Sequence, residues 1–144
     1  MNKIKNYIFF LIYLLLNPKF FLKGIKGMYL PVTIQYEWLK NYEIDIIIDV
    51  GAFVGNVSQT LNDIFPKAKI FAFDPIEENC RAIKNKSFSK RIVVEQIAIS
   101  NKNGEALFYK HNYLPTSSLL PLEDEYKSKF PVMKIIKVKM STLD

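Results

Sequence analysis

Glycine and acidic residues with the spacing of a cofactor site lie in the middle of the chain. Gly51 and Gly55 bracket a short loop, and Asp49 directly precedes it. A second acid, Asp74, follows Gly55 by about 20 residues, the interval at which a carboxylate meets ribose hydroxyls in nucleotide-type sites. Such a carboxylate accepts short, charge-assisted hydrogen bonds from the 2′ and 3′ hydroxyls. The pattern therefore predicts a loop that approaches a ligand closely and an acid that holds its sugar.

The segments around these residues predict an α/β unit. Ile46, Ile47 and Ile48 form an unbroken β-branched run, typical of a strand buried on both faces of a parallel sheet. After the loop, apolar residues recur with a helical period as far as Pro66. A second apolar strand, residues 69–73, ends at Asp74. The order strand, glycine turn, helix, strand is the opening of a nucleotide-binding α/β domain.

Further elements follow Asp74. Residues 75–86 predict a helix that begins at Pro75 and has Cys80 on its inner face, and residues 91–97 predict a third strand. Asn103-Gly104 predicts a hairpin that joins residues 98–100 to a strand at 105–109, and residues 132–140 predict another strand. His111 is the sole histidine and so the obvious general-base candidate, although a surface position between two tyrosines is the stronger prediction.

Four segments carry a family resemblance: IDVGAFVG, IFAFDPIEEN, QIAIS and the closing VKMSTLD. Together they resemble the FkbM-type methyltransferases over residues 44–144. The resemblance implies an α/β class I methyltransferase fold, a Rossmann-like doubly wound parallel sheet that binds S-adenosylmethionine. It implies O-methylation of a hydroxyl on a sugar or small metabolite. The implied cofactor contacts are Asp49, Gly51, Ala52, Phe53, Gly55, Asp74, Gln96, Ala98 and Ser118.

Two departures and two alternatives accompany this resemblance. Phe53 stands where the family usually has asparagine, and Asp74 stands where glutamate is commoner.

The first alternative is an NAD- or FAD-dependent oxidoreductase, which is disfavoured because Phe53 occupies the middle glycine position of G-x-G-x-x-G. The second is a non-catalytic, membrane-associated fragment. It is kept because the predicted parallel strands are few and the sheet is expected to be incomplete at its C-terminal end. The residues offer no convincing catalytic base.

An apolar, basic segment at residues 1–28 is predicted to precede the methyltransferase domain at 29–144. Residues 1–30 contain five lysines and no acid, and residues 7–16 are all apolar or aromatic. That run is about half the length needed to span a bilayer. Three interpretations compete: an interfacial membrane anchor over residues 7–22, a helix packed on protein, and a signal peptide without a small-residue cleavage site.

Composition limits the partners and the compartment. The net charge is +6, and Arg81 and Arg91 are the only arginines, whereas sequence-specific nucleic-acid recognition favours bidentate arginine. The single cysteine excludes an internal disulfide and fits a reducing compartment. No histidine–cysteine grouping suggests a metal site. We therefore expect a cytoplasmic protein, membrane-associated if the N-terminal segment is an anchor, with a small-molecule or glycan acceptor and no nucleic-acid partner.

Overall fold

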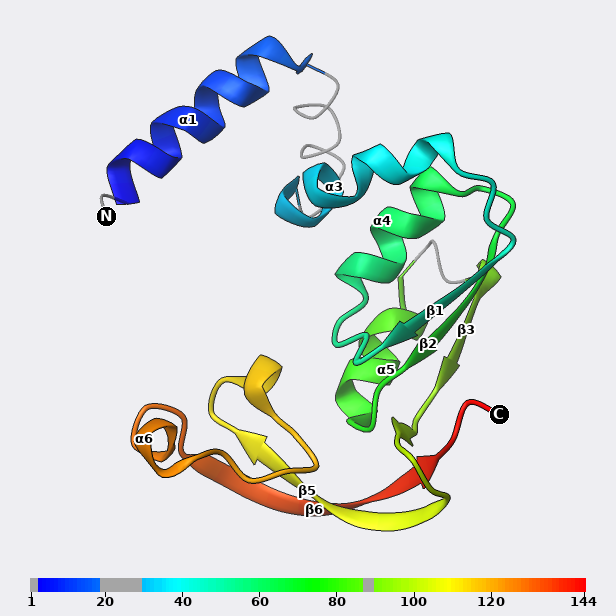
Figure 1. The fold of residues 1–144 in the computed structure, drawn as a ribbon, viewed down its shortest axis with the longest axis vertical. Coiled ribbons are helices and arrows are strands. Elements are labelled where there is room, and N and C mark those ends of the chain that lie inside the picture. Colours follow the sequence, from blue (N-terminus) through cyan, green and yellow to red (C-terminus); the bar gives the residue numbers. More distant parts are fainter. Residues whose placement is uncertain (1–2, 19–29, 87–89) are drawn as a thin grey trace.

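The computed structural model describes residues 3–18, 30–86 and 90–144 of the chain (Figure 1). The fold is mixed α/β, with one parallel three-stranded sheet and one mixed three-stranded sheet. In chain order the elements are α1 (Lys3–Leu16), α3 (Leu30–Tyr36), a 3₁₀ helix (Glu37–Asn41), β1 (Ile46–Val50), α4 (Asn56–Ile64), β2 (Lys69–Phe73), α5 (Glu77–Lys84), β3 (Ile92–Glu95), β4 (Ala98–Ile99), β5 (Gly104–His111), a 3₁₀ turn (Leu114–Thr116), α6 (Asp124–Lys127) and β6 (Val132–Ser141).

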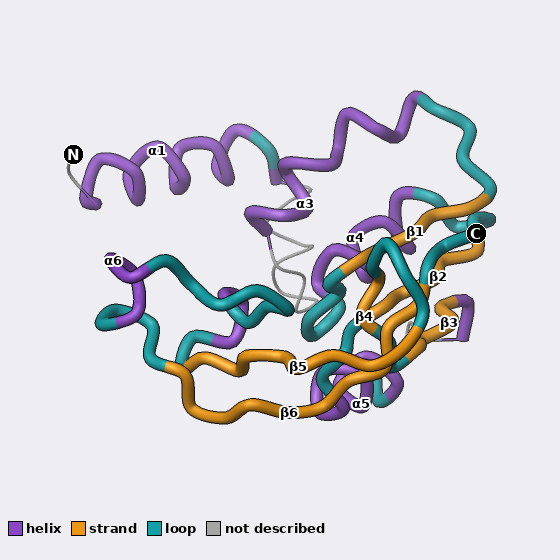
Figure 2. Tube along the Cα trace, turned by 60° about the horizontal axis from the view of Figure 1, so that its bottom comes forward, coloured by secondary structure: helices purple, strands orange, loops and turns teal. Residues whose placement is uncertain are grey.

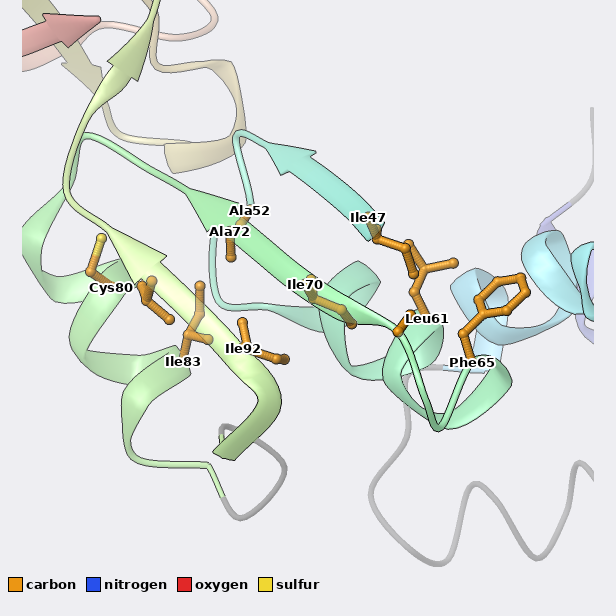
Figure 3. Close-up of a cluster of buried hydrophobic side chains, with 11 residues drawn as sticks. Ile47, Ala52, Leu61, Phe65, Ile70, Ala72, Cys80, Ile83 and Ile92 are labelled. Atoms are coloured by element: carbon orange, nitrogen blue, oxygen red, sulfur yellow. The ribbon is translucent and has the colours of Figure 1, made fainter. Parts of the chain in front are cut away.

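The first sheet has the order β1-β2-β3, and all its strands are parallel. Parallel neighbours need a crossover connection, and α4 and α5 supply the two crossovers. Both helices cover the same face of the sheet (Figure 1). The core forms between this face and the helices, where isoleucines of three adjacent strands meet Leu61 of α4, Phe65 at the end of that helix, and Ile83 of α5 (Figure 3).

The opposite face of β1 is exposed. Ile46, Ile48 and Val50 are 62%, 51% and 53% exposed, whereas Ile47 is buried. The prediction of a strand buried on both faces is therefore wrong for β1. Alternation along the strand directs Ile47 toward the helices, and no element of the described ranges covers the other side. The described residues thus place helices on one face, and not on both as in a doubly wound sheet.

The second sheet has the order β4-β6-β5. β4 is parallel to β6, and β5 is antiparallel to β6, so β5 and β6 run side by side (Figure 2). The predicted hairpin between residues 98–100 and 105–109 is wrong, because β6 lies between these two segments. Asn103 instead uses its side-chain oxygen to accept hydrogen bonds from Ser141 Oγ and the Thr142 amide, at 3.0 and 3.1 Å. A contact distant in sequence thus replaces the local turn.

The N-terminal segment is described only as far as residue 18. Helix α1 lies apart from the two sheets in Figure 1. The later part of the predicted segment, including Phe20, Phe21 and Leu22, lies outside the described residues. Among the helices that the structure describes, none is long and apolar enough to cross a membrane.

Candidate functional site

A cavity of about 760 Å³ lies where the two sheets meet. Its volume is in the range typical of small-molecule sites. Its wall comes from segments far apart in sequence: the glycine loop after β1, the end of β2, strands β4, β5 and β6, and the serine-rich segment after the 3₁₀ turn. The carboxyl ends of β1 and β2 reach one edge of the parallel sheet together, and ligands of open α/β sheets bind at that edge.

Five of the nine predicted cofactor contacts line this cavity. They are Gly51, Phe53, Asp74, Ala98 and Ser118. The remaining four, Asp49, Ala52, Gly55 and Gln96, are not part of its lining.

The four residues outside the lining are placed differently from one another. Ala52 and Gly55 are the buried residues of the loop, and Gln96 is exposed. Asp49 is directed toward α4, where its Oδ2 accepts a 2.6 Å hydrogen bond from Ser58 Oγ. Asp49 therefore holds the first turn of α4 against β1.

Asp74 has a buried carboxylate that accepts three hydrogen bonds. Its Oδ1 accepts from the Ile76 amide at 2.9 Å and from Asn79 Nδ2 at 3.0 Å, and its Oδ2 accepts from the Phe53 amide at 2.9 Å. An ionised carboxylate offers about four lone-pair positions. One position, on Oδ2, is therefore left for a further donor. Asp74 fastens the glycine loop to the start of α5 and still borders the cavity.

The amides of the glycine loop are largely satisfied within the protein. Gly51 N and Ala52 N both donate to Phe73 O, at 2.9 and 3.0 Å, and Gly55 N donates to Ala52 O at 2.8 Å. Phe53, whose φ is 49°, is the one non-glycine residue of the described chain with a positive φ. Its amide is bound to Asp74. This hydrogen bond helps to hold the unusual backbone conformation of Phe53. Strained backbone conformations of this kind are common at binding sites.

A lysine holds the same loop from the other side. Lys86 Nζ donates to the carbonyl oxygen of Val54 at 2.6 Å. Burial lowers the pKa of this lysine. The loop is thus held at its amides by Asp74 and the Phe73 carbonyl, and at one carbonyl by Lys86.

The buried carboxylate of Asp74 and the half-buried carboxylate of Asp49 give this end of the site an anionic character. Burial is the main factor that raises the pKa of Asp49, and hydrogen bonding by Ser58 opposes it. Burial also raises the pKa of Asp74, against the lowering effects of its Ile76, Asn79 and Phe53 hydrogen bonds. The Asp74 charge contributes a smaller upward shift at Asp49. A bound cation would relieve the mutual repulsion and part of the desolvation cost.

The apolar walls, the polar rim and the residue that orients Asp74 were not predicted from the sequence. The walls include Phe73, Ile97, Leu119 and Met140, and the rim at the far end includes Ser100, Asn101, Lys102 and Glu105. Asn79 is 4% exposed and fixes Asp74 Oδ1. Its position in the first turns of the helix that follows Asp74 was a usable signal, since a side-chain amide there can reach back to the carboxylate.

His111 is completely buried, so its predicted surface position is wrong. Residues 112–118 fold back on β5, where Tyr109 and Ser118 exchange backbone hydrogen bonds, and this return covers the ring. His111 Nδ1 lies 2.9 Å from Thr116 O and donates to it, while Nε2 is buried without a partner. His111 does not line the cavity. As a general base it stays an unsupported prediction.

No protein-family model matches the chain, and no curated protein matches it. No cluster of three or more metal-ligating side chains occurs within residues 3–18, 30–86 and 90–144. The chemistry of the site thus rests on its own geometry: an anionic floor with one open acceptor position, apolar walls and a polar rim.

Proposed function

We propose that this chain binds S-adenosylmethionine and belongs to the Rossmann-like, class I methyltransferases of the FkbM type. The methyl acceptor would be a hydroxyl of a sugar or a small metabolite. One observation carries the proposal: Gly51, Phe53, Asp74 and Ser118, taken from three separate segments, line a single cavity of cofactor size.

The charge and hydrogen bonding of the loop favour a cationic ligand over a pyrophosphate. Dinucleotide loops bind phosphate through free backbone amides at a helix N-terminus. Here the amides of Gly51, Ala52 and Phe53 are already bound to protein acceptors. A phosphate would also meet the carboxylate of Asp74, with Asp49 close behind it. The positively charged sulfonium and amino groups of S-adenosylmethionine suit this environment, which argues against an NAD or FAD enzyme.

The residues of the cavity fit the remaining parts of the cofactor. The open position on Asp74 Oδ2 can accept a hydrogen bond from one ribose hydroxyl. The apolar side chains of Phe73, Ile97 and Leu119 can pack against an adenine ring. When bound, the cofactor supplies a methyl group activated by its sulfonium. The protein's contribution is orientation, which can supply roughly 7–11 kcal/mol of the barrier reduction in well-aligned reactions.

Calorimetric titration with S-adenosylmethionine and with NAD tests the proposal. We expect the wild-type chain to bind the former more tightly. Asp74→Asn should weaken that binding by about 1.5–3 kcal/mol through loss of a charge-assisted hydrogen bond. Asp124→Asn, at an exposed carboxylate of α6, is the matched control and should bind like wild type.

Two results would count against the proposal. One is tighter binding of NAD than of S-adenosylmethionine by the wild-type chain. The other is unchanged S-adenosylmethionine affinity in an Asp74→Asn protein that still unfolds cooperatively.

A further inference from the structure

Helix α1 presents an apolar face to solvent. Ile8, Leu11, Ile12 and Leu15 recur at the spacing of one helical face, and they are 50%, 58%, 46% and 81% exposed. In a helix of a globular domain, residues with this spacing form the stripe that packs on the core. A contiguous exposed apolar surface of this kind marks a site of interaction with a membrane or another protein.

The excess of lysine over acidic residues is concentrated in the N-terminal part of the sequence, which includes this helix. Lys3, Lys5, Lys19, Lys23 and Lys26 lie within residues 1–30, which contain no acid. These five lysines account for all but one unit of the net charge of +6. Clusters of lysine beside an apolar helix are attracted to the anionic lipids of a bilayer surface.

The length of α1 determines how it would lie in a bilayer. Its 14 residues extend about 21 Å at 1.5 Å per residue, less than the roughly 30 Å of hydrocarbon that a spanning helix must cross. The helix is therefore suited to lie in the plane of the interface with its apolar face toward the acyl chains. Its position away from the two sheets leaves that face accessible to a flat surface (Figure 1).

A second copy of the chain is a poorer occupant of this face. Pairing α1 with its counterpart would bring two lysine-rich segments together without any acid in residues 1–30 to compensate them. Like charges at short range oppose such an association. An anionic bilayer can bury the apolar face among its acyl chains and attract the lysines with its headgroups.

We propose that α1 docks this chain on anionic lipid bilayers as an interfacial helix. The test is flotation of the full chain with phosphatidylcholine vesicles that contain or lack phosphatidylserine. Leu11→Asp places a charge on the apolar face, and we expect it to reduce binding to the anionic vesicles by more than about tenfold. Leu143→Asp is the matched control, because it makes the same charge change at an exposed leucine outside α1 and should keep binding.

A second pair of variants tests the role of charge. Lys3→Gln combined with Lys5→Gln should weaken binding to anionic vesicles by about fivefold for each lysine. Lys67→Gln combined with Lys90→Gln removes the same charge from exposed positions outside residues 1–30 and should have little effect.

Three outcomes would overturn the inference. The first is equal loss of binding in Leu11→Asp and Leu143→Asp. The second is equal loss in the two lysine pairs, which would indicate attraction by overall charge alone. The third is a lipid-free dimer that Leu11→Asp converts to a monomer, since the apolar face would then belong to a second copy. Urea unfolding of each variant verifies that the α/β domain is intact.

Discussion

Replacement of Gly55 by alanine should destabilise the fold through contact with α5. Gly55 is the N-cap of α4 and has a φ of 79°. A Cβ at this position would lie 2.9 Å from Ile83 Cγ1 and 3.4 Å from Ile83 Cγ2. Ile83 is completely buried, so its side chain has little room to move. Gly51 provides a matched control, because its φ is 76° but a Cβ there would meet nothing within 4 Å.

The two substitutions share their backbone cost and differ in the steric contact. An alanine in the left-handed region costs about 1–2 kcal/mol at either position. Overpacking against a buried side chain adds about 1–3 kcal/mol at Gly55 alone. We therefore expect Gly55→Ala to lower the free energy of unfolding by about 2–5 kcal/mol and Gly51→Ala by about 1–2 kcal/mol. Any gain from reduced unfolded-state entropy is the same for both and cancels in the difference.

Urea denaturation followed by far-ultraviolet circular dichroism measures this difference. A double-mutant cycle with Ile83→Ala identifies its cause, because removal of both γ carbons should recover the steric part of the Gly55→Ala penalty. Equal destabilisation by the two alanine variants would refute the reasoning. So would an unchanged Gly55→Ala penalty in the Ile83→Ala background.

Three further outcomes are expected. Asn79→Ala removes a hydrogen bond to the Asp74 carboxylate and should cost about 1.5–3 kcal/mol in urea unfolding, while Asn41→Ala, at an exposed asparagine, should stay within about 0.5 kcal/mol of wild type. Burial raises the pKa of Asp49 above its usual value of 3.8 in the folded chain. The contribution of Asp49 to stability is therefore most favourable below pH 3.8 and is lost as the pH rises through the raised pKa. Asp49→Asn should therefore stabilise the protein at neutral pH and flatten this part of its pH profile, and a variant less stable than wild type there would contradict this. Cys80 is 3% exposed, burial raises the pKa of its thiol, and its Sγ donates to Asp74 O. A thiol reagent should therefore label Cys80 only after the protein unfolds, and rapid labelling of the native protein would disprove this placement.

The sequence was sufficient to predict the elements that depend on local pattern. The segment 69–73 was predicted as a strand and forms β2. The predicted strand at residues 132–140 corresponds to β6, which extends one residue further. Cys80 was predicted to be packed and is buried. In each case alternation, helical period or a flanking proline acts within a few residues, so no knowledge of distant contacts was needed.

The errors concern contacts between distant segments. The composition of β1 cannot reveal which of its faces a helix will cover, so Ile46 and Ile48 were expected to be buried. The preference of Asn103-Gly104 for a tight hairpin was overridden by the pairing of β5 with β6. The burial of His111 depends on the return of residues 112–118 over β5. For the site, the glycine loop and Asp74 were predictable from spacing. The apolar walls combine Phe73 of β2 with Met140 of β6 and with Ile97 and Leu119 from loops, and the sequence did not indicate this arrangement.

The hydrogen bonds of the Asp74 carboxylate should couple the local unfolding of the two apolar clusters. Ile76, whose amide binds Asp74 Oδ1, buries its side chain in the second apolar cluster with Phe108, Val138 and Met140. The same carboxylate binds the Phe53 amide beside the first cluster. One side chain thus connects a loop of one sheet to the core of the other, and the two clusters should open as one cooperative unit. In native-state hydrogen exchange, the amides of Phe53 and Ile76 should exchange with the same opening free energy, and a ligand bound in the cavity should slow both together.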